Sequence, residues 1–487
     1  MAQIINIENV YYSYPRKNKW ALENINLSIE EGEFLAVMGE NGAGKTTLLR
    51  LINGIIPHSS QGRFLGSVKI DGERTDTSSV ARLALKVGMV LDDPDAQIFT
   101  SSVFGEAAFG PENLLLPESE IIERVEFALS AVGLLSLKDR QPATLSGGEK
   151  QRLAIACALA MKGRILVLDE PLARLDPQGE AEVMSVVRDI CQKYQITVIM
   201  ASHDSEKMAE SADRVCVLKD GRVAVCDTAR KIFADSALLE ENGIQPPCAV
   251  DINAVFSLKK ERLSGAESGI PAIEIKNFCY YYGDGARIEN INISIKDNDF
   301  TAIIGNNGCG KTTLLKNITG LLRPSGGDIF IRGKNVKELT VSGISKEIGF
   351  VMQNPDNQLF TDSVFNEVSF ALKNMRLSKK EIDSRVQDAL CAVGLKDADA
   401  FPHALSRADR TKTLVACVLA MGCKIIIFDE VDAGQDYKSS RHIMNLAREL
   451  WHKGFTILFV THNMSLACEY AHKLVIMNRN GTEYFEK

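Results

Sequence analysis

The stretch GENGAGKT, from Gly39 to Thr46, decides the fold that this sequence predicts. It fits the pattern GxxxxGK[ST], and it lies between the apolar run FLAVM and the run TTLLRLING, so a strand should lead into the loop and a helix should follow. Glycines let backbone amides close around phosphate oxygens, and the first turn of the helix adds the positive end of its dipole. The stretch therefore predicts a phosphate-binding loop in an α/β domain.

Individual residues of this loop have distinct expected roles. The ammonium of Lys45 should reach the outer phosphates of a nucleotide, and the hydroxyl of Thr46 should bind Mg²⁺. The residues expected to line the nucleotide are Gly39, Asn41, Gly42, Gly44, Lys45, Thr46 and Thr47. A glycine-rich turn can match the pattern by accident, but that alternative weakens once the pattern occurs twice in one chain.

The chain contains a second copy of the loop, GNNGCGKT, from Gly305 to Thr312. Other strings recur in the same order, because LDDPDAQIFTSSVF from Leu91 matches MQNPDNQLFTDSVF from Met352, and ILVLDE matches IIIFDE. The nucleotide-lining residues of the second copy are Gly305, Asn307, Gly308, Gly310, Lys311, Thr312 and Thr313. A repeat of roughly 220 to 235 residues has the length of a domain. We therefore expect a first α/β domain at 1–236, a linker at 237–270 and a second domain at 271–487.

Composition places the chain among ordinary globular proteins and disfavours several functional classes. Of its 487 residues, 45% are hydrophobic and 24% are charged, and no run approaches the roughly 18 apolar residues of a membrane helix. The first residues lack a signal-peptide pattern, so we expect a cytoplasmic chain unless a partner holds it elsewhere. A net charge of −7 disfavours non-specific binding to nucleic acid. The 11 cysteines show no metal-ligand spacing and are expected to be reduced and mostly buried.

Each copy also carries an Asp-Glu pair directly after an aliphatic run, RILVL in the first and KIIIF in the second. In a phosphate-binding domain the Asp suits Mg²⁺, through a metal-bound water, and the Glu suits polarisation of an attacking water. A histidine that ends a later β-rich run in each copy could position the γ-phosphate and that water. Helix capping by the acids and a structural histidine remain alternatives for each residue taken alone. The candidate metal-binding residues are Thr46, Asp169, Thr312 and Asp429, and the candidate catalytic residues are Glu170, His203, Glu430 and His462.

Taken together, these motifs resemble the nucleotide-binding domains of ABC ATPases. The string LSGGEKQR resembles the signature motif of that family, with Ser146, Gly147 and Gly148 at its centre. The resemblance implies an ATP hydrolase of two tandem P-loop domains, each with a mixed, mostly parallel sheet and a helical signature subdomain. It also implies that the two domains sandwich two ATP molecules, each held by the phosphate loop of one domain and the signature of the other. Tyr14 and Tyr282 resemble the aromatic residue that stacks on adenine, and packing among neighbouring tyrosines is the alternative role.

The two composite sites that this crossed arrangement implies are unequal in sequence. The intact signature would serve the nucleotide of the second half, where Gln353 stands at the Q-loop position of the family and would join the metal site. The altered signature Ser406-Arg407-Ala408 would serve the first half, where Asp92 replaces that glutamine. Side chains at the two glycine positions would keep backbone amides from the γ-phosphate. We expect slow hydrolysis at the first-half site and turnover at the second, with neutral drift and two active sites as the alternative.

The segments NPDNQLFTDSVF and DPDAQIFTSSVF resemble the segment after the Q-loop in energy-coupling factor (ECF) importers and in related cobalt and nickel importers. That resemblance implies attachment at the cytoplasmic face of the membrane, on a transmembrane T component, with a separate S component that captures a vitamin or metal. The alternatives are the ATPase of another importer, such as the sugar type, and a soluble non-transport ABC ATPase. The linker lacks the long charged helix of translation factors, and the motif spacing leaves no room for the coiled coil of repair ATPases.

Overall fold

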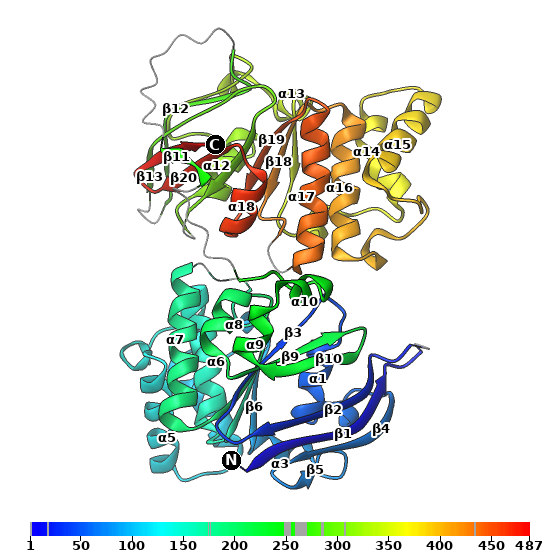
Figure 1. Ribbon diagram of the computed structural model, residues 1–487. Helices are drawn as coiled ribbons and strands as arrows, with labels where there is room; N and C mark the ends of the chain where they lie inside the picture. Colours follow the sequence, from blue (N-terminus) through cyan, green and yellow to red (C-terminus); the bar gives the residue numbers. More distant parts are fainter. Residues whose placement is uncertain are drawn as a thin grey trace. The chain divides into compact units, whose positions relative to one another are not determined.

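The computed structural model describes residues 2–16, 19–173, 175, 177–247, 255–258, 270–283, 287–305, 308–432 and 435–487. The chain divides into two compact units, the first formed by residues 1–248 and 436–438 and the second by residues 249–435 and 439–487. Figure 1 shows that each unit contains its own sheets and its own set of helices. Much of the predicted linker, 237–270, falls outside the described residues.

The first unit contains a mostly parallel sheet and an antiparallel sheet. The mostly parallel sheet has the order β10 (Arg222–Thr228), β9 (Arg214–Lys219), β3 (Phe34–Met38), β8 (Thr197–Ala201), β7 (Ile165–Asp169) and β6 (Val87–Val90), with only β10 antiparallel to its neighbour. The antiparallel sheet has the order β2 (Leu22–Glu30), β1 (Gln3–Ser13), β4 (Arg63–Ile70) and β5 (Glu73–Arg74).

The second unit repeats both sheets. Its mostly parallel sheet has the order β11 (Ser257–Leu258), β21 (Gly481–Glu486), β20 (Lys473–Asn478), β14 (Phe300–Ile304), β19 (Thr456–Val460), β18 (Ile425–Asp429) and β17 (Ile348–Val351). Its antiparallel sheet has the order β13 (Arg287–Ile295), β12 (Ile273–Tyr281), β15 (Gly326–Ile331) and β16 (Lys334–Asn335).

Most helices of the first unit have a counterpart in the second. The first unit has α1 (Lys45–Ile52), α2 (Ile55–His58), α3 (Val80–Ala84), α4 (Val103–Asn113), α5 (Glu118–Ala131), α6 (Gly147–Ala160), α7 (Pro177–Tyr194), α8 (Ser205–Ser211), α9 (Ala229–Ala234) and α10 (Ser236–Glu241). The second has α12 (Lys311–Ile318), α13 (Val341–Ile344), α14 (Val364–Asn374), α15 (Lys379–Val393), α16 (Arg407–Met421), α17 (Tyr437–His452) and α18 (Met464–Tyr470). Helices α14, α15 and α16 pack together (Figure 1), and α4, α5 and α6 do so in the first unit.

The central strand β3 shows why each unit has two hydrophobic cores. All five of its residues are buried, because both faces of the parallel sheet are covered. Phe34, Ala36 and Met38 face the helical core with α4, α5 and α6, whereas Leu35 and Val37 face the antiparallel sheet and α1. Strand β14 divides its side chains in the same way. The fold class predicted from the sequence, two tandem P-loop domains with a mixed sheet, is confirmed.

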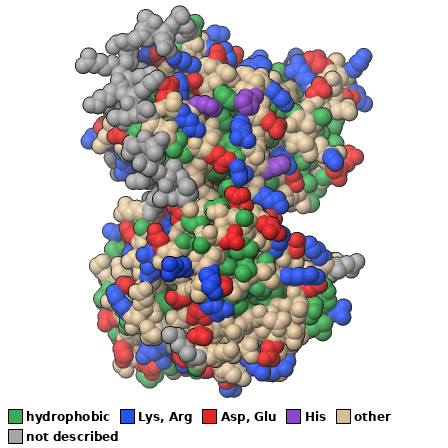
Figure 2. Space-filling view, viewed as in Figure 1, with side chains coloured by type: hydrophobic (Ala, Val, Ile, Leu, Met, Phe, Trp, Pro, Cys, Tyr) green, Lys and Arg blue, Asp and Glu red, His purple; other side chains and the backbone are tan. Residues whose placement is uncertain are grey.

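The surface and the helices add two observations. In Figure 2, lysine and arginine side chains are interspersed with aspartate and glutamate side chains over the visible face of each unit. Within the described part of the chain, no helix combines the length and the apolar character that spanning a membrane requires.

Candidate functional site

Each phosphate loop joins a buried strand to a helix through glycines that cannot be replaced without distortion. Gly39 follows β3 with a φ of +143°, and a Cβ there would lie 2.2 Å from the carbonyl oxygen of Leu218 in β9. Gly44 has a φ of +107° and forms the N-cap of α1. In the second loop, a Cβ on Gly305 would lie 2.3 Å from the carbonyl oxygen of Met477 in β20. The backbone of both loops therefore depends on residues without side chains.

The remaining loop positions are distributed along the turn and the helix start. Gly42 and Gly308 are also left-handed, with φ values of +79° and +70°, and Gly310 caps α12 as Gly44 caps α1. Asn41 lies beside His203, whose Nε2 is 3.1 Å from the Asn41 Oδ1. Asn307 lies outside the described residues.

The lysine of each loop is buried and bends back over the loop. The Lys45 Nζ donates to the carbonyl oxygen of Gly39 at 2.9 Å and lies 3.7 Å from the Glu170 Oε1. The Lys311 Nζ donates to the carbonyl oxygen of Gly305 at 2.8 Å and lies 3.6 Å from a carboxylate oxygen of Glu430. Burial lowers the pKa of Lys45, and the charge of Glu170 opposes that effect. Both ammonium groups are thus held at the place where the outer phosphates of a nucleotide would enter.

The threonine after each lysine meets the aspartate at the end of a parallel strand. The Thr46 Oγ1 donates to the Asp169 Oδ1 at 3.2 Å, and Asp169 is the last residue of β7. Thr312 likewise hydrogen-bonds Asp429, the last residue of β18. A hydroxyl beside a carboxylate supplies the oxygen ligands that Mg²⁺ prefers, so these residues fit a magnesium-nucleotide complex.

The glutamate that follows each aspartate has a backbone conformation that is rare for its residue type. Glu170 has a φ of +48° and Glu430 a φ of +46°, both in the left-handed region. The amide of Glu170 donates to the Ala201 carbonyl at 3.0 Å, and the amide of Glu430 donates to the Val460 carbonyl at 3.0 Å. These bonds tie the strained residues to the neighbouring strand. Strain of this kind concentrates at functional sites.

A histidine contacts each of these glutamates, at different distances. The His203 Nε2 lies 3.2 Å from the Glu170 Oε1 and 3.1 Å from the Lys45 Nζ. The His462 Nε2 lies 2.8 Å from the Glu430 Oε1. The structure therefore brings lysine, threonine, aspartate, glutamate and histidine together in each unit, and their catalytic roles remain predictions.

The acidic residues of the two units differ in their proton affinity. Burial raises the pKa of Glu170 to about 7 against the opposing charge of Lys45. Burial would also raise the pKa of Glu430, but the hydrogen bond and charge of His462, together with Lys311, hold it below the ordinary value. Burial lowers the pKa of His203 to about 3, with a further contribution from Lys45, so this histidine is neutral at physiological pH. The first glutamate is thus the weaker acid of the two.

The Q-loop position accentuates this difference. The Gln353 Nε2 donates to the Glu430 Oε2 at 3.2 Å, so the glutamine contacts the proposed water-polarising group of its own unit. Asp92 stands at the equivalent position and adds a negative charge near Asp169. The pKa of Asp169 is raised mainly by burial, and the charge of Asp92 raises it further. The pKa of Asp429 is raised to about 6, first by burial and then by Glu430.

The two candidate adenine-stacking residues lie against the phosphate-loop helices. The Tyr14 and Thr47 hydroxyls are 3.1 Å apart, and Tyr282 hydrogen-bonds Thr313 in the same way. Tyr14 also packs edge to face on the buried Tyr12, with ring centroids 5.0 Å apart. These contacts place both tyrosines beside the phosphate loop, and they fit either adenine stacking or packing.

The signature residues start a helix in both units. Ser146 caps α6, and its backbone amide donates to the Glu149 Oε2 at 2.7 Å. A Cβ on Gly148 would lie 3.3 Å from the Cα of Gly179, so the close approach of α6 and α7 gives this glycine a packing role as well. Gly147 is exposed at the helix start.

The altered signature makes a contact with its own unit. Ser406 caps α16, and the Arg407 Nη2 donates to the backbone carbonyl of Gln353 at 3.2 Å. The arginine that replaces a glycine therefore ties the start of α16 to the Q-loop of the same unit.

Sequence reasoning missed two residues that shape the segment after each Q-loop. The buried Glu106 accepts hydrogen bonds from the amides of Phe99 at 3.1 Å and Thr100 at 2.7 Å. The buried Glu367 accepts the equivalent bonds from Phe360 at 3.1 Å and Thr361 at 2.9 Å. The recurrence of Glu in SSVFGE and DSVFNE was the available signal, since a carboxylate on the apolar side of a helix needs partners.

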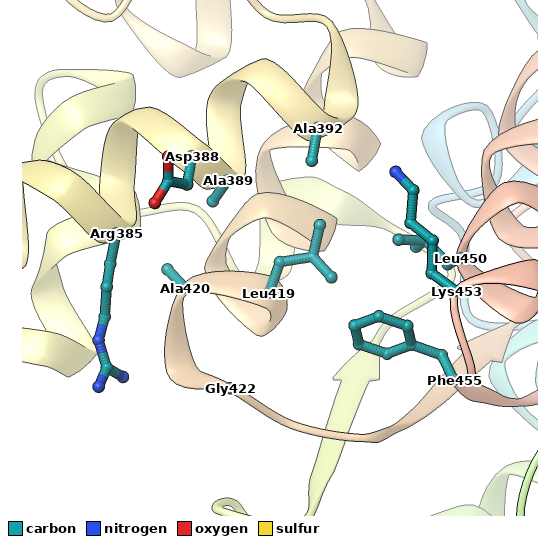
Figure 3. A pocket seen from close by; sticks show the side chains of 10 residues that line it. All are labelled: Arg385, Asp388, Ala389, Ala392, Leu419, Ala420, Gly422, Leu450, Lys453 and Phe455. Atoms are coloured by element: carbon teal, nitrogen blue, oxygen red, sulfur yellow. The ribbon is translucent and has the colours of Figure 1, made fainter.

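A cavity of about 360 Å³ lies elsewhere in the second unit (Figure 3). Figure 3 shows Arg385 and Lys453 on opposite sides of it, with Leu419 between them. None of the predicted site residues lines this cavity. The cavity is therefore separate from the candidate ATP site.

Comparisons with known proteins agree with this geometry. The family model described as ABC transporter matches residues 22–173 and 288–433. A protein of Caldanaerobacter subterraneus subsp. tengcongensis, provisionally named ABC transporter ATP-binding protein, is 34% identical over 99% of this chain and 91% of its own length. Similarly named proteins of Methanosarcina acetivorans and Bacillus anthracis are 37% and 31% identical, over 98% of this chain and over 84% and 90% of their own lengths.

Two solved structures are similar to parts of the chain. The cbiO1 protein of Clostridium perfringens, described as part of the ABC transporter complex cbiONQ, is 37% identical over 50% of this chain and 94% of its own, with a TM-score of 0.45. A dimeric bacterial ABC transporter cassette is 28% identical over 46% of this chain and 99% of its own, with a TM-score of 0.41.

Proposed function

The chain belongs to the ABC transporter family and is an ATP hydrolase with two tandem ATPase domains, and on that premise we propose that it powers an ECF-type importer of a vitamin or transition metal. In this proposal it sits at the cytoplasmic face of the membrane, bound to a transmembrane T component and, through it, to a substrate-binding S component. The supporting observation is a pair of exposed phenylalanines in the segment after each Q-loop.

These phenylalanine pairs are unusually exposed for their residue type. Phe99 and Phe109 have exposed fractions of 66% and 45%, and their ring centroids lie 4.8 Å apart. Phe360 and Phe370 have exposed fractions of 63% and 45%, with the same 4.8 Å separation. Exposed aromatic clusters of this kind commonly mark protein interfaces. Two such clusters suit a partner that presents two apolar helices.

Hydrogen bonds within each unit connect the segments that carry these pairs to the Q-loop positions. The Gln97 Oε1 accepts from the amide of Leu91 at 2.8 Å, and the Gln358 Oε1 accepts from the amide of Met352 at 2.8 Å, directly before the two Q-loop positions. A partner that displaced an aromatic pair would therefore also shift the backbone next to the Q-loop residue.

The same segments are also bonded to the signature helices. Lys150 in α6 donates to Asp95 at 2.7 Å, and Arg410 in α16 donates to Asp356 at 2.6 Å. Each ion pair joins the NPD-type segment to the helix that the signature starts. This arrangement could transmit partner binding to both the Q-loop and the signature.

We also propose that the two ATP sites are unequal. In the ATP-bound state the signature of each domain would face the nucleotide of the other, so the site with Gln353 and Glu430 would receive the intact signature. Bound magnesium would neutralise phosphate charge, and Thr312 and Asp429 would hold it. Glu430, with its lowered pKa and its contacts to Gln353 and His462, would orient the attacking water. Thr46, Asp169, Glu170 and His203 would form the slower site, with Asp92 in place of the glutamine.

The experiment that tests the importer proposal is affinity capture of the tagged full-length chain from gently solubilised membranes, followed by mass spectrometry. The wild-type chain should recover a small polytopic protein together with a second, substrate-binding membrane protein. A variant with Phe99→Ala and Phe360→Ala should lose both proteins and still bind ATP.

The matched control carries Leu65→Ala and Leu321→Ala, which remove exposed apolar side chains away from the aromatic pairs. This control should keep the membrane partners. Equal loss from both variants would contradict docking at the phenylalanines. Recovery of no membrane protein by the wild-type chain would favour a soluble non-transport ABC ATPase, and recovery of a different permease would favour another importer class.

A further inference from the structure

Two cysteines face each other across the β9–β10 hairpin of the first unit. The antiparallel register pairs Cys216 directly with Cys226. Directly opposite residues in such a ladder have Cα atoms about 4.5 to 5.5 Å apart, which lies within the span of about 4.4 to 6.8 Å found for disulfides. Their side chains share one face of the sheet. The two sulfur atoms can therefore bond without a large movement of the backbone.

An arginine is fixed beside this pair. Arg214 lies two residues before Cys216, so its side chain shares the same face of β9, and its Nη2 donates to the Cys226 Sγ at 3.2 Å. Its Nη1 donates to the Glu33 Oε1 at 3.0 Å, and Glu33 is buried. Anchored by that carboxylate, the guanidinium keeps a positive charge next to one of the two sulfur atoms.

The pKa values of the two thiols are shifted in opposite directions. The hydrogen bond from Cys216 is the main cause that lowers the pKa of Cys226, and Arg214 lowers it further against burial and the charge of Glu33. The hydrogen bond to Cys226 and burial both raise the pKa of Cys216. Cys226 is also the more accessible of the two, because Cys216 is fully buried and Cys226 is half-buried. The pair thus consists of an accessible nucleophile and a buried resolving thiol.

The hairpin borders the phosphate loop of its unit. Cys216 pairs with Val37 of β3, the strand that leads into the loop. The Gly221 amide at the hairpin turn donates to the carbonyl of Ala43, within the loop, at 3.1 Å. A bond between the two strands would therefore form next to the first nucleotide site.

We propose that Cys216 and Cys226 form a redox-active dithiol that a hydroperoxide converts to a disulfide. The Cys226 thiolate attacks one peroxide oxygen, the O–O bond breaks, and hydroxide or alkoxide leaves while Cys226 becomes a sulfenic acid. The Cys216 sulfur then attacks the sulfenic sulfur, its proton and the departing hydroxide leave as water, and the S–S bond forms. The two cysteines lose two electrons in total, and the peroxide gains them.

The second unit provides an internal contrast. Its equivalent hairpin pairs Val475 with Tyr484, and Lys473 stands where the first unit has Arg214. The device is therefore confined to the first unit.

The test is peroxide treatment of the reduced full-length chain, quenching with N-ethylmaleimide and peptide mass spectrometry. We expect a linked pair of peptides containing Cys216 and Cys226, two hydrogens lighter than the reduced pair and reversed by dithiothreitol. It should form about tenfold faster than the exposed Cys391 is oxidised, since the thiolate is the reacting species. A Cys216→Ser variant should stop at a sulfenic acid on Cys226, trapped by dimedone.

Variants at the arginine make the test selective. Arg214→Gln should slow oxidation of Cys226 several-fold, Arg214→Lys should restore part of the rate, and the rate at the exposed Cys391 should stay unchanged in both, as a control for the dose of peroxide. Maleimide on both Cys216 and Cys226 after peroxide treatment would overturn the proposal. Oxidation of Cys226 no faster than that of Cys391 in the wild-type chain would overturn it equally.

Discussion

At the scale of single residues, the glutamates after β7 and β18 show how different surroundings change the pKa of the same residue type. Both have a left-handed backbone and lie near a lysine and a histidine. The histidine contact is 2.8 Å at Glu430 and 3.2 Å at Glu170. The hydrogen bond and charge of His462, together with Lys311, hold the pKa of Glu430 below its ordinary value, whereas burial dominates at Glu170 and raises its pKa to about 7. The same residue type can therefore be charged in one unit and partly protonated in the other.

The raised pKa of Glu170 predicts a specific dependence of stability on pH. A carboxyl with a folded pKa of about 7 and an ordinary pKa of 4.5 binds more protons in the folded chain, so stability falls as pH rises from 4.5 to 7. The maximum cost above pH 7 is about 3 kcal/mol. Glu170→Gln should therefore raise the melting temperature of the nucleotide-free chain by a few degrees at pH 8 and leave it nearly unchanged at pH 4.5. Differential scanning calorimetry at the two pH values measures this.

The matched variant is Glu430→Gln, because the pKa of Glu430 is held below its ordinary value. Its charged form contributes stability above the ordinary pKa, and that contribution is lost as pH falls through the folded pKa. Glu430→Gln should thus lower the melting temperature at pH 8. Shifts of the same sign in both variants would show that the two carboxyls do not differ as described.

The tyrosines beside the phosphate loops allow stacking to be separated from packing. Tyr14→Phe keeps the ring and removes only the hydrogen bond to Thr47, worth about 1 kcal/mol of stability. Tyr14→Ala removes the ring. If the ring stacks on adenine, Tyr14→Phe should keep ATP affinity within about twofold and Tyr14→Ala should weaken it about tenfold. Titration with a fluorescent ATP analogue measures both, and equal affinity in the two variants would assign Tyr14 to packing.

Sequence patterns indicate which residues form each phosphate loop, but they do not predict the pKa values of the acidic residues beside it. Glycine, lysine and threonine positions follow from the geometry that a phosphate demands, so Lys45 and Thr46 could be named directly. The difference in pKa between Glu170 and Glu430 could not be predicted, because it depends on burial and on contacts with residues distant in the sequence.

At the scale of elements, the segment between β17 and α14 is held by a helix residue rather than by its own sequence. Glu367 in α14 accepts the amides of Phe360 and Thr361, and it also accepts the Thr361 hydroxyl at 2.8 Å. One buried carboxylate therefore fixes the loop that presents an exposed phenylalanine. The sequence shows the recurrence of this glutamate, but only the folded element shows why it lies inside helix α14.

Replacement of this anchor should release the segment. Glu367→Ala leaves two backbone amides without an acceptor, at a cost of about 2 to 4 kcal/mol in local stability. Hydrogen exchange of residues 354–363 should accelerate at least tenfold, while exchange in β14 and α12 should remain unchanged. Glu367→Gln keeps the shape and one acceptor oxygen and should give an intermediate effect. Unchanged exchange in Glu367→Ala would show that the loop is fixed by other contacts.

At the scale of the whole chain, the duplication gives one polypeptide two ATPase domains with different residues at equivalent positions. The repeated motifs predicted this duplication and the fold of each copy, because the same strand, loop and helix patterns occur twice. The repeated motifs do not identify a membrane partner or a transported substrate, since these depend on contacts with other polypeptides.

The inequality of the two sites predicts unequal losses of ATPase activity. Glu430→Gln should reduce steady-state ATP hydrolysis about 100-fold or more, the loss typical of removing a general base. Glu170→Gln should retain more than half of the activity if, as proposed, the site with Asp92 contributes little turnover. Phosphate release by the purified full-length chain measures both rates. Comparable losses would establish two active sites and neutral drift in the altered signature.

The occurrence of Asp92 and Gln353 at equivalent positions of one chain has a genetic consequence. A cassette encoded once and used as a homodimer carries every mutation in both of its sites, so a change that suits one site is tested in the other as well. Here each domain is encoded by its own part of the gene, so a point mutation changes only one of the two copies of a motif. One domain can then lose an activity and acquire another, such as the proposed response to peroxide, while the other domain of the same chain keeps the original activity.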